Sequence, residues 1–115
     1  MNITEQSRGK VIVLKLKGSF MGEPEASLFH KKKFQLIEAK QISLVLDCSE
    51  MAMINSSGLG SLISALVSLR ALGGDLRFAN LSETINFVIQ KVQLDKVFRI
   101  FGTVEEAAMS FEDHL

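Results

Sequence analysis

The sequence has one cysteine, no net charge and no long apolar run, and each absence excludes a class of protein. Cys48 cannot form an internal disulfide, and no histidine or second cysteine stands at metal-ligand spacing from it. The 13 basic and 13 acidic residues cancel and form no basic stripe with aromatic neighbours, which disfavours nucleic acid and anionic membranes as partners. No apolar run approaches the ~18 residues of a membrane span, and the N-terminus is too polar for a signal peptide. We therefore expect a cytoplasmic protein with a protein partner, no membrane insertion, no metal and no cofactor.

The chain is long enough for one folded domain, which we expect to span residues 1–115. A chain of 115 residues can bury roughly two-thirds of its unfolded surface in a single core. No internal repeat, linker or low-complexity tract interrupts it. Strand and helix patterns alternate along it, which predicts an α/β fold with a mixed central β-sheet of about four to five strands flanked by about four α-helices.

Five segments have the pattern of strands. The period-two alternation of a half-buried strand and the continuous apolar run of a fully covered one are both present. The segments are a short strand around Ile3, a strand ending at Gly18 in which Ile12, Leu14 and Leu16 alternate with Val11, Val13, Lys15 and Lys17, the apolar run 42–46, a strand at Leu76 and Phe78, and residues 97–101.

The first expected helix starts at Glu23-Pro24, because proline is tolerated in a first helical turn, and stops near Lys40. His30 and Lys33 project towards its apolar side, where a packed histidine and a snorkelling lysine are the expected roles. Its predicted inward residues are Ala26, Phe29, Phe34, Leu36 and Ile37.

Three further helices have clearer signals. The second follows residues 55–60 and stops at Gly73-Gly74, the third is capped by Ser82, and a Thr103–Glu106 capping box opens the fourth. Their predicted inward residues are Leu59, Leu62, Ile63 and Leu66, then Ile85, Val88, Ile89 and Val92, and finally Val104, Ala107, Ala108 and Phe111.

The segment Asn55-Ser56-Ser57-Gly58-Leu59-Gly60 joins the end of an apolar strand to the start of the second helix. A serine there lies beside unpaired backbone N–H groups at the positive end of the helix dipole. A phosphate on Ser57 would be accommodated at such a place and would add roughly two negative charges. The alternative is that Ser56 or Ser57 is only an N-cap and the glycines only a tight turn.

A row of small polar residues follows this segment along the second helix. Ser61, Ser64 and Ser68 recur at helical spacing opposite the leucine stripe, with Ala65 beside them and no charge before Arg70. Small uncharged side chains allow another backbone to approach closely. The row is therefore a candidate partner-binding face, and ordinary solvent exposure is the alternative.

Together these residues resemble the signature of the STAS domain family, which includes bacterial anti-sigma-factor antagonists and the cytoplasmic tails of sulfate transporters. The resemblance begins at Asp47-Cys48-Ser49 and continues through the Asn55–Gly60 segment. It extends over essentially the whole chain, through Gly18, Gly73-Gly74, the segment 94–98 and the helix start 103–107.

The resemblance implies a non-enzymatic, partner-switching anti-sigma-factor antagonist. Its partners would be an anti-sigma-factor serine kinase, bound while the antagonist is unphosphorylated, and a PP2C-like phosphatase. Ser57 matches the family's phosphate acceptor, whose modification breaks the complex. The partner-binding residues would be Asn55, Ser56, Ser57, Gly58, Leu59, Gly60, Ser61, Ser64 and Ser68.

The sequence departs from the family at two positions that are commonly acidic in antagonists. It has Asn55 before the two serines, and Met21-Gly22 after the glycine of the second strand. Fewer carboxylates would repel a phosphate less. The same loss is compatible with an adaptor that is never phosphorylated, such as a subunit docked on a transporter ATPase or a signalling complex.

An enzyme fits the sequence less well. A serine nucleophile needs a base within hydrogen-bond reach, and the two histidines are His30, flanked by lysines, and His114, next to the C-terminus. Gly-x-Ser-x-Gly is absent, and Gly58-Leu59-Gly60 lacks the remaining residues of a dinucleotide or nucleoside triphosphate loop. We therefore expect no catalytic residues.

Overall fold

A computed structural model of the chain describes residues 1–112, which alternate between strands and helices as the sequence predicts. The elements are β1 (Asn2–Arg8), β2 (Val11–Phe20), α1 (Glu25–Glu38), β3 (Ser43–Asp47), β4 (Met51–Ile54), α2 (Ser56–Ala71), β5 (Asp75–Ala79), α3 (Glu83–Lys91), the 3₁₀ helix η1 (Leu94–Lys96), β6 (Arg99–Phe101), α4 (Val104–Met109) and the 3₁₀ helix η2 (Ser110–Glu112).

The strands form one mixed sheet in the order β1-β2-β3-β5-β6, with β4 paired to the end of β2. The β1–β2 hairpin is antiparallel, and every other pairing is parallel. Because β3 pairs with the first half of β2 and β4 with its last residues, the two short strands follow each other along one side of β2. The predicted mixed sheet and α/β class are confirmed, with six strands in the described part of the chain.

The second strand does not end at Gly18 as predicted. The register between β2 and β4 shifts between Gly18 and Ser19, and the strand continues to Phe20. Gly18 has φ +109°, a conformation that side chains disfavour, so the glycine marks a bulge inside the strand and not its end. Its partner β4 is a strand in its own right and is not among the five strand segments expected from the sequence.

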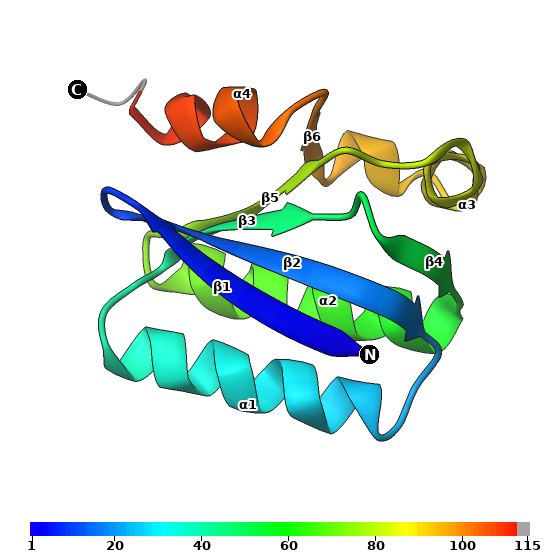
Figure 1. Ribbon diagram of the computed structural model, residues 1–115, viewed down its shortest axis with the longest axis horizontal. Helices are drawn as coiled ribbons and strands as arrows, with labels where there is room; N and C mark the ends of the chain where they lie inside the picture. Colours follow the sequence, from blue (N-terminus) through cyan, green and yellow to red (C-terminus); the bar gives the residue numbers. More distant parts are fainter. Residues whose placement is uncertain (113–115) are drawn as a thin grey trace.

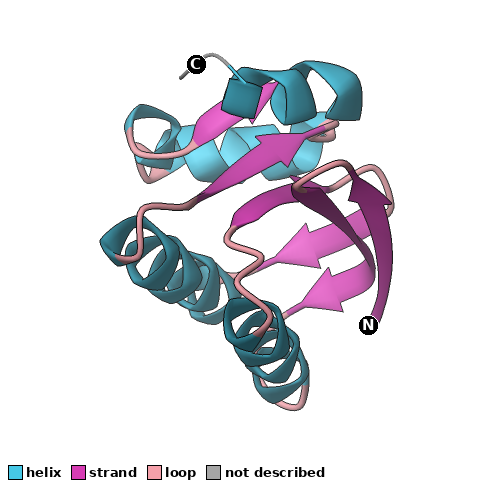
Figure 2. Cartoon of the chain, turned by 90° about the vertical axis from the view of Figure 1, so that its left-hand side faces the viewer, coloured by secondary structure: helices cyan, strands magenta, loops and turns pink. Residues whose placement is uncertain are grey.

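The sheet is covered on both faces. α1 and α2 lie side by side on one face, and α4 lies on the other (Figures 1 and 2). The alternation in β2 sends its side chains into two separate cores. The larger core includes Ile12, Leu14, Leu16, Phe29, Leu36, Leu62, Leu66 and Phe78, and the smaller one consists of Val11, Val13, Val45, Ala79, Val104 and Ala107.

Two apolar residues predicted to face inward are exposed instead. Phe34 in α1 is 59% exposed and Val92, which follows α3, is 52% exposed. In α1 the inward face is formed by Phe29, Lys33 and Leu36, which follow the i, i+4, i+7 spacing of one helix face. Lys33 projects inward as expected, but it is only 5% exposed, so the expected snorkelling to solvent is not observed; its Nζ lies 4.7 Å from the centroid of the Phe34 ring.

The burial along α2 gives a test of the fold. Leu62 is 1% exposed, whereas Ser64, two residues further along the helix, is exposed. We predict that Leu62→Ala lowers the free energy of unfolding by about 2 to 5 kcal/mol through the cavity it leaves, and that Ser64→Ala changes it by less than about 0.5 kcal/mol. Urea titrations of both variants measure this, and a larger loss for Ser64→Ala would show that the helix is rotated.

Candidate functional site

The serine segment lies where β4 meets α2, beside the loop that joins β2 to α1. Ser56 and Ser57 are the first two residues of α2, and both are exposed. The loop approaches Ser57 through Gly22, where an added Cβ would lie 3.7 Å from the Ser57 Oγ. The Ser57 hydroxyl is therefore on the surface, at the start of a 16-residue helix, with a side-chain-free residue next to it.

Asn55 caps this helix and ties it to the neighbouring loop. Its Oδ1 accepts a hydrogen bond from the Gly58 amide at 2.9 Å, and its Nδ2 donates to the Met21 carbonyl at 3.0 Å. Neither Ser56 nor Ser57 is the N-cap, so the alternative interpretation of these serines as caps is wrong. Both hydroxyls are free of that structural role, and the amide group of Asn55 performs it.

Gly58 lets the first turn of α2 pass directly over the end of β2. A Cβ at this position would lie 2.2 Å from the Phe20 carbonyl oxygen and 2.9 Å from Ile54. Gly60, one half-turn further on, is exposed and has nothing within 4 Å of its Cβ position. The first glycine is thus required by packing, whereas nothing in the described chain requires the second.

The nine residues predicted to bind a partner differ in exposure. Ser56, Ser57, Gly60 and Ser64 are exposed, Asn55, Ser61 and Ser68 are half-buried, and Gly58 and Leu59 are buried. Ala65, which the sequence places beside the serine row, is fully buried, so the row forms one edge of the helix and not a broad outer face. The structure therefore brings Ser56, Ser57, Gly60 and Ser64 to the surface along α2, and Gly58 and Leu59 hold that surface in place.

Two exposed methionines border this surface. The sequence pointed to Met21 only as a candidate neighbour of Ser57, through its departure from the family, and did not identify Met53 as a site residue. Met21 is 45% exposed and its carbonyl is bound by Asn55, while Met53 is 47% exposed on β4, two residues before Asn55. Exposed methionines are common at protein-binding surfaces because their flexible side chains adapt to a partner. The sequence signal for Met21 was its position, because antagonists of this family commonly have an acidic residue there.

Ser57 lies in the first turn of α2, which contains no acidic residue. The amides of Ser56 and Ser57 belong to the first turn of α2 and have no intrahelical acceptor. The nearby carboxylate of Glu23 accepts a hydrogen bond from the Ser27 hydroxyl. An anion on Ser57 would therefore meet a helix N-terminus, which favours negative charge.

The groups that could support catalysis are placed elsewhere. Cys48 is 1% exposed, and burial, reinforced by the adjacent Asp47 carboxylate, raises the pKa of its thiol far above the usual range. His30 lies in α1 with a buried Nδ1, and burial together with the Lys33 charge lowers the pKa of its imidazole. His114 lies outside the described residues.

A long-range contact braces the loop before β4. Oδ1 of Asp47 accepts hydrogen bonds from the Ser49 amide at 3.0 Å and from Asn80 Nδ2 at 3.1 Å. It fixes the loop between β3 and β4 against the end of β5. Across residues 1–112, no three metal-ligating side chains gather into a metal site, and no helix is long and apolar enough to span a bilayer.

The fold and the position of the serine segment define a STAS domain, and the chain belongs to this family, whose pattern matches residues 2–107. Among curated relatives it is 25% identical over 97 residues to a Thermotoga neapolitana protein named as a proposed anti-sigma factor antagonist and TM1081 homolog, covering 84% of this chain and 86% of that protein.

Solved structures have the same fold. TM1081 of Thermotoga maritima, described as a proposed anti-sigma factor antagonist, superposes with a TM-score of 0.86 at 23% identity, covering 94% of this chain and 92% of that one. The phosphorylated form of SpoIIAA, a Bacillus cell fate determinant, gives a TM-score of 0.73 at 19% identity, covering 95% and 97% of the two chains. The Thermotoga neapolitana relative and the structural neighbours TM1081 and SpoIIAA are named as anti-sigma factor antagonists.

The two glycines of the serine segment make a matched pair for mutagenesis. We predict that Gly58→Ala destabilises the protein by more than about 2 kcal/mol, because the new methyl group would overlap the Phe20 carbonyl. Gly60→Ala should stabilise it by about 0.5 to 1 kcal/mol, because alanine is the better helix former and meets no neighbour. The urea midpoints of the two variants measure these changes in stability. Equal effects would contradict the close contact assigned to Gly58.

The hydrogen bond from Asn55 to the Met21 carbonyl can be tested separately from the helix cap that Asn55 also provides. Asn55→Asp keeps an oxygen for the Gly58 amide but turns a second oxygen towards the Met21 carbonyl. The lost hydrogen bond should cost more than the ~0.3 to 1 kcal/mol gained from a carboxylate at the helix N-terminus, so we predict a net loss of about 1 kcal/mol in unfolding free energy. Asn55→Ser, which keeps only the cap, is the control. An unchanged unfolding free energy for Asn55→Asp would show that the hydrogen bond to the Met21 carbonyl does not stabilise the fold.

Proposed function

We propose that this chain is an anti-sigma-factor antagonist that switches partners through Ser57. While Ser57 is unmodified, the protein binds an anti-sigma-factor serine kinase and so frees the sigma factor. Phosphorylation of Ser57 by that kinase breaks the complex, and a PP2C-like phosphatase restores the binding form. The observation that carries this proposal is an exposed Ser57 hydroxyl at the start of α2 that takes no part in capping the helix.

The surroundings of Ser57 support its role as phosphate acceptor. Gly22 leaves space beside the hydroxyl, and the free amides of the first helical turn favour an anion there. Asn55 holds the Met21 loop and the helix start together, so the acceptor stands on a braced surface. A kinase would thus find the hydroxyl accessible without local unfolding.

The surface around Ser57 also supports docking of a protein. Its outer members Ser56, Gly60 and Ser64 are small and uncharged, and Met21 and Met53 add apolar area at its border. Burying such a surface requires little desolvation while Ser57 carries no charge. A phosphate would have to be desolvated or paired on binding, and a loss of about 3 to 4 kcal/mol would weaken the complex a few hundredfold.

A second candidate is a STAS adaptor that is never phosphorylated and docks on a transporter ATPase or a signalling complex. It is favoured by the amide at Asn55 and the apolar Met21, both at positions commonly acidic in phosphorylated members. The adaptor would use the same surface, and Ser57 would contribute only its small size. The two candidates differ in whether binding depends on the charge at Ser57.

We predict that Ser57→Asp weakens binding to the kinase encoded by a neighbouring gene by at least ~100-fold, because an unpaired carboxylate would be buried in the interface. Ser57→Ala should bind as the parent does but accept no phosphate. Ser56→Ala, which alters the adjacent exposed hydroxyl, is the matched control and should bind and be phosphorylated normally.

Calorimetric titration, followed by intact-mass measurement after addition of ATP, checks all three variants. If Ser57→Asp binds as tightly as the parent and no variant gains a phosphate, the switch is excluded and the adaptor is the better account.

A further inference from the structure

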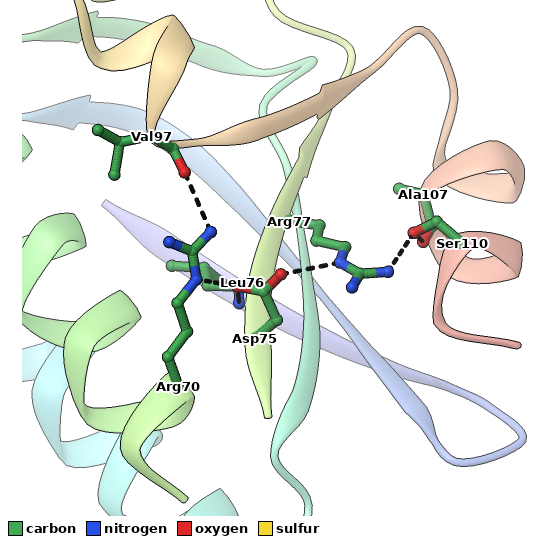
Figure 3. Close-up of polar contacts among 7 residues, drawn as sticks. All are labelled: Arg70, Asp75, Leu76, Arg77, Val97, Ala107 and Ser110. Atoms are coloured by element: carbon green, nitrogen blue, oxygen red, sulfur yellow. Dashed lines mark hydrogen bonds and ion pairs between the residues drawn. The ribbon is translucent and has the colours of Figure 1, made fainter. Parts of the chain in front are cut away.

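The other end of α2 carries a network of charged side chains that the serine site does not use. Asp75 at the start of β5 accepts hydrogen bonds from Arg70 Nε at 2.8 Å and from Arg77 Nε at 2.9 Å (Figure 3). Arg70 also donates to the Val97 carbonyl, and Arg77 Nη1 donates to the Ser110 hydroxyl at 2.7 Å. The two guanidinium groups thus share one carboxylate.

Arg77 is the unusual member of this network because its side chain is almost fully covered and one of its guanidinium nitrogens makes no hydrogen bond within residues 1–112. Its side chain is 5% exposed, and its Cζ lies 4.0 Å from the centroid of the Phe111 ring. Nε and Nη1 are bonded, whereas Nη2 points away from both Asp75 and Ser110 and has no hydrogen-bond partner within residues 1–112 (Figure 3). This N–H group is therefore available to donate to a ligand.

A cavity of about 260 Å³ lies beside the network of Arg70, Asp75 and Arg77. Its lining residues are Ser43, Arg70, Gly73, Gly74, Asp75, Arg77 and Phe111. Burial by itself would raise the pKa of Asp75, but hydrogen bonds from Arg77, Arg70 and the Leu76 amide hold it below its ordinary value, so the carboxylate is ionised at neutral pH. One negative charge therefore faces two positive ones, and the cavity wall carries a net positive charge.

We propose that this cavity binds a small oxyanion, such as inorganic phosphate or the carboxylate group of a small metabolite. An oxyanion would accept from Arg77 Nη2 and from the Ser43 hydroxyl, which also lines the cavity and has no side-chain partner within residues 1–112. Guanidinium groups match the planar or tetrahedral oxygens of such anions better than an ammonium does. The site is distinct from Ser57, because Arg70 lies 13 positions after Ser57 along α2, a rise of about 20 Å.

Solution NMR of the full chain tests this site directly. Sodium phosphate and, in a separate arm, sodium acetate are titrated into labelled protein while sodium chloride keeps the ionic strength constant. We expect saturable shifts of the Arg77 side-chain Nε signal and of the Ser43, Gly73 and Gly74 amides. Saturation in both arms indicates a general oxyanion site, and saturation with one anion identifies its preferred chemistry.

Ser43→Asp is the decisive variant, because it places a carboxylate in the cavity without removing a member of the arginine network. It should weaken phosphate binding about tenfold or more. Thr84→Asp adds the same charge to the exposed first turn of α3 and should leave the affinity within about twofold. The proposal is overturned if the parent shows no saturable shift, if the shifts centre on the Ser56 and Ser57 amides, or if Ser43→Asp binds phosphate as tightly as the parent.

Discussion

The contact between the first turn of α2 and the end of β2 is the constraint on which the functional surface depends. At Gly58 the two backbones are so close that a Cβ would lie 2.2 Å from the Phe20 carbonyl oxygen. The same carbonyl accepts a hydrogen bond from the Asn55 amide, so helix and strand are joined immediately before the serines. With the helix start fixed in this way, Ser57 is held at the surface by backbone packing and needs no side-chain contact of its own.

The fold was largely predictable because its strands and helices have regular apolar periods. The alternation in β2 correctly predicted a strand, and the apolar run 42–46 correctly predicted a strand covered on both faces. The capping serine and threonine correctly marked the starts of α3 and α4. The period failed in α1, where the aliphatic stem of Lys33 occupies the inward position and the neighbouring Phe34 is turned outward. A hydropathy pattern counts lysine as polar over its whole length, so it cannot represent a lysine whose aliphatic stem packs inward beside an aromatic ring.

The candidate site was predictable in its local part only. Ser57 and the glycines are adjacent in sequence, and a strand-to-helix junction places them without reference to the rest of the chain. The hydrogen bond from Asn55 to the Met21 carbonyl joins residues 34 positions apart, and Asp47 is linked to Asn80 over 33 positions. No pattern in one sequence reports such contacts. The arginine network at the far end of α2 was missed for the same reason, since Arg77 and Ser110 meet only after the C-terminal elements pack on the sheet.

The two ends of α2 therefore have opposite characters. Its N-terminal end offers small uncharged side chains and free amides, which suit a surface whose affinity is set by adding one charge. We predict that this charge is added in the cell by phosphorylation of Ser57. Mass spectrometry of the protein purified from its own cells tests this most directly, through the peptide that spans residues 51–70. We expect a singly phosphorylated form whose fragments place the phosphate on Ser57. A phosphate on Ser56, or no phosphate under any growth condition, would contradict the account.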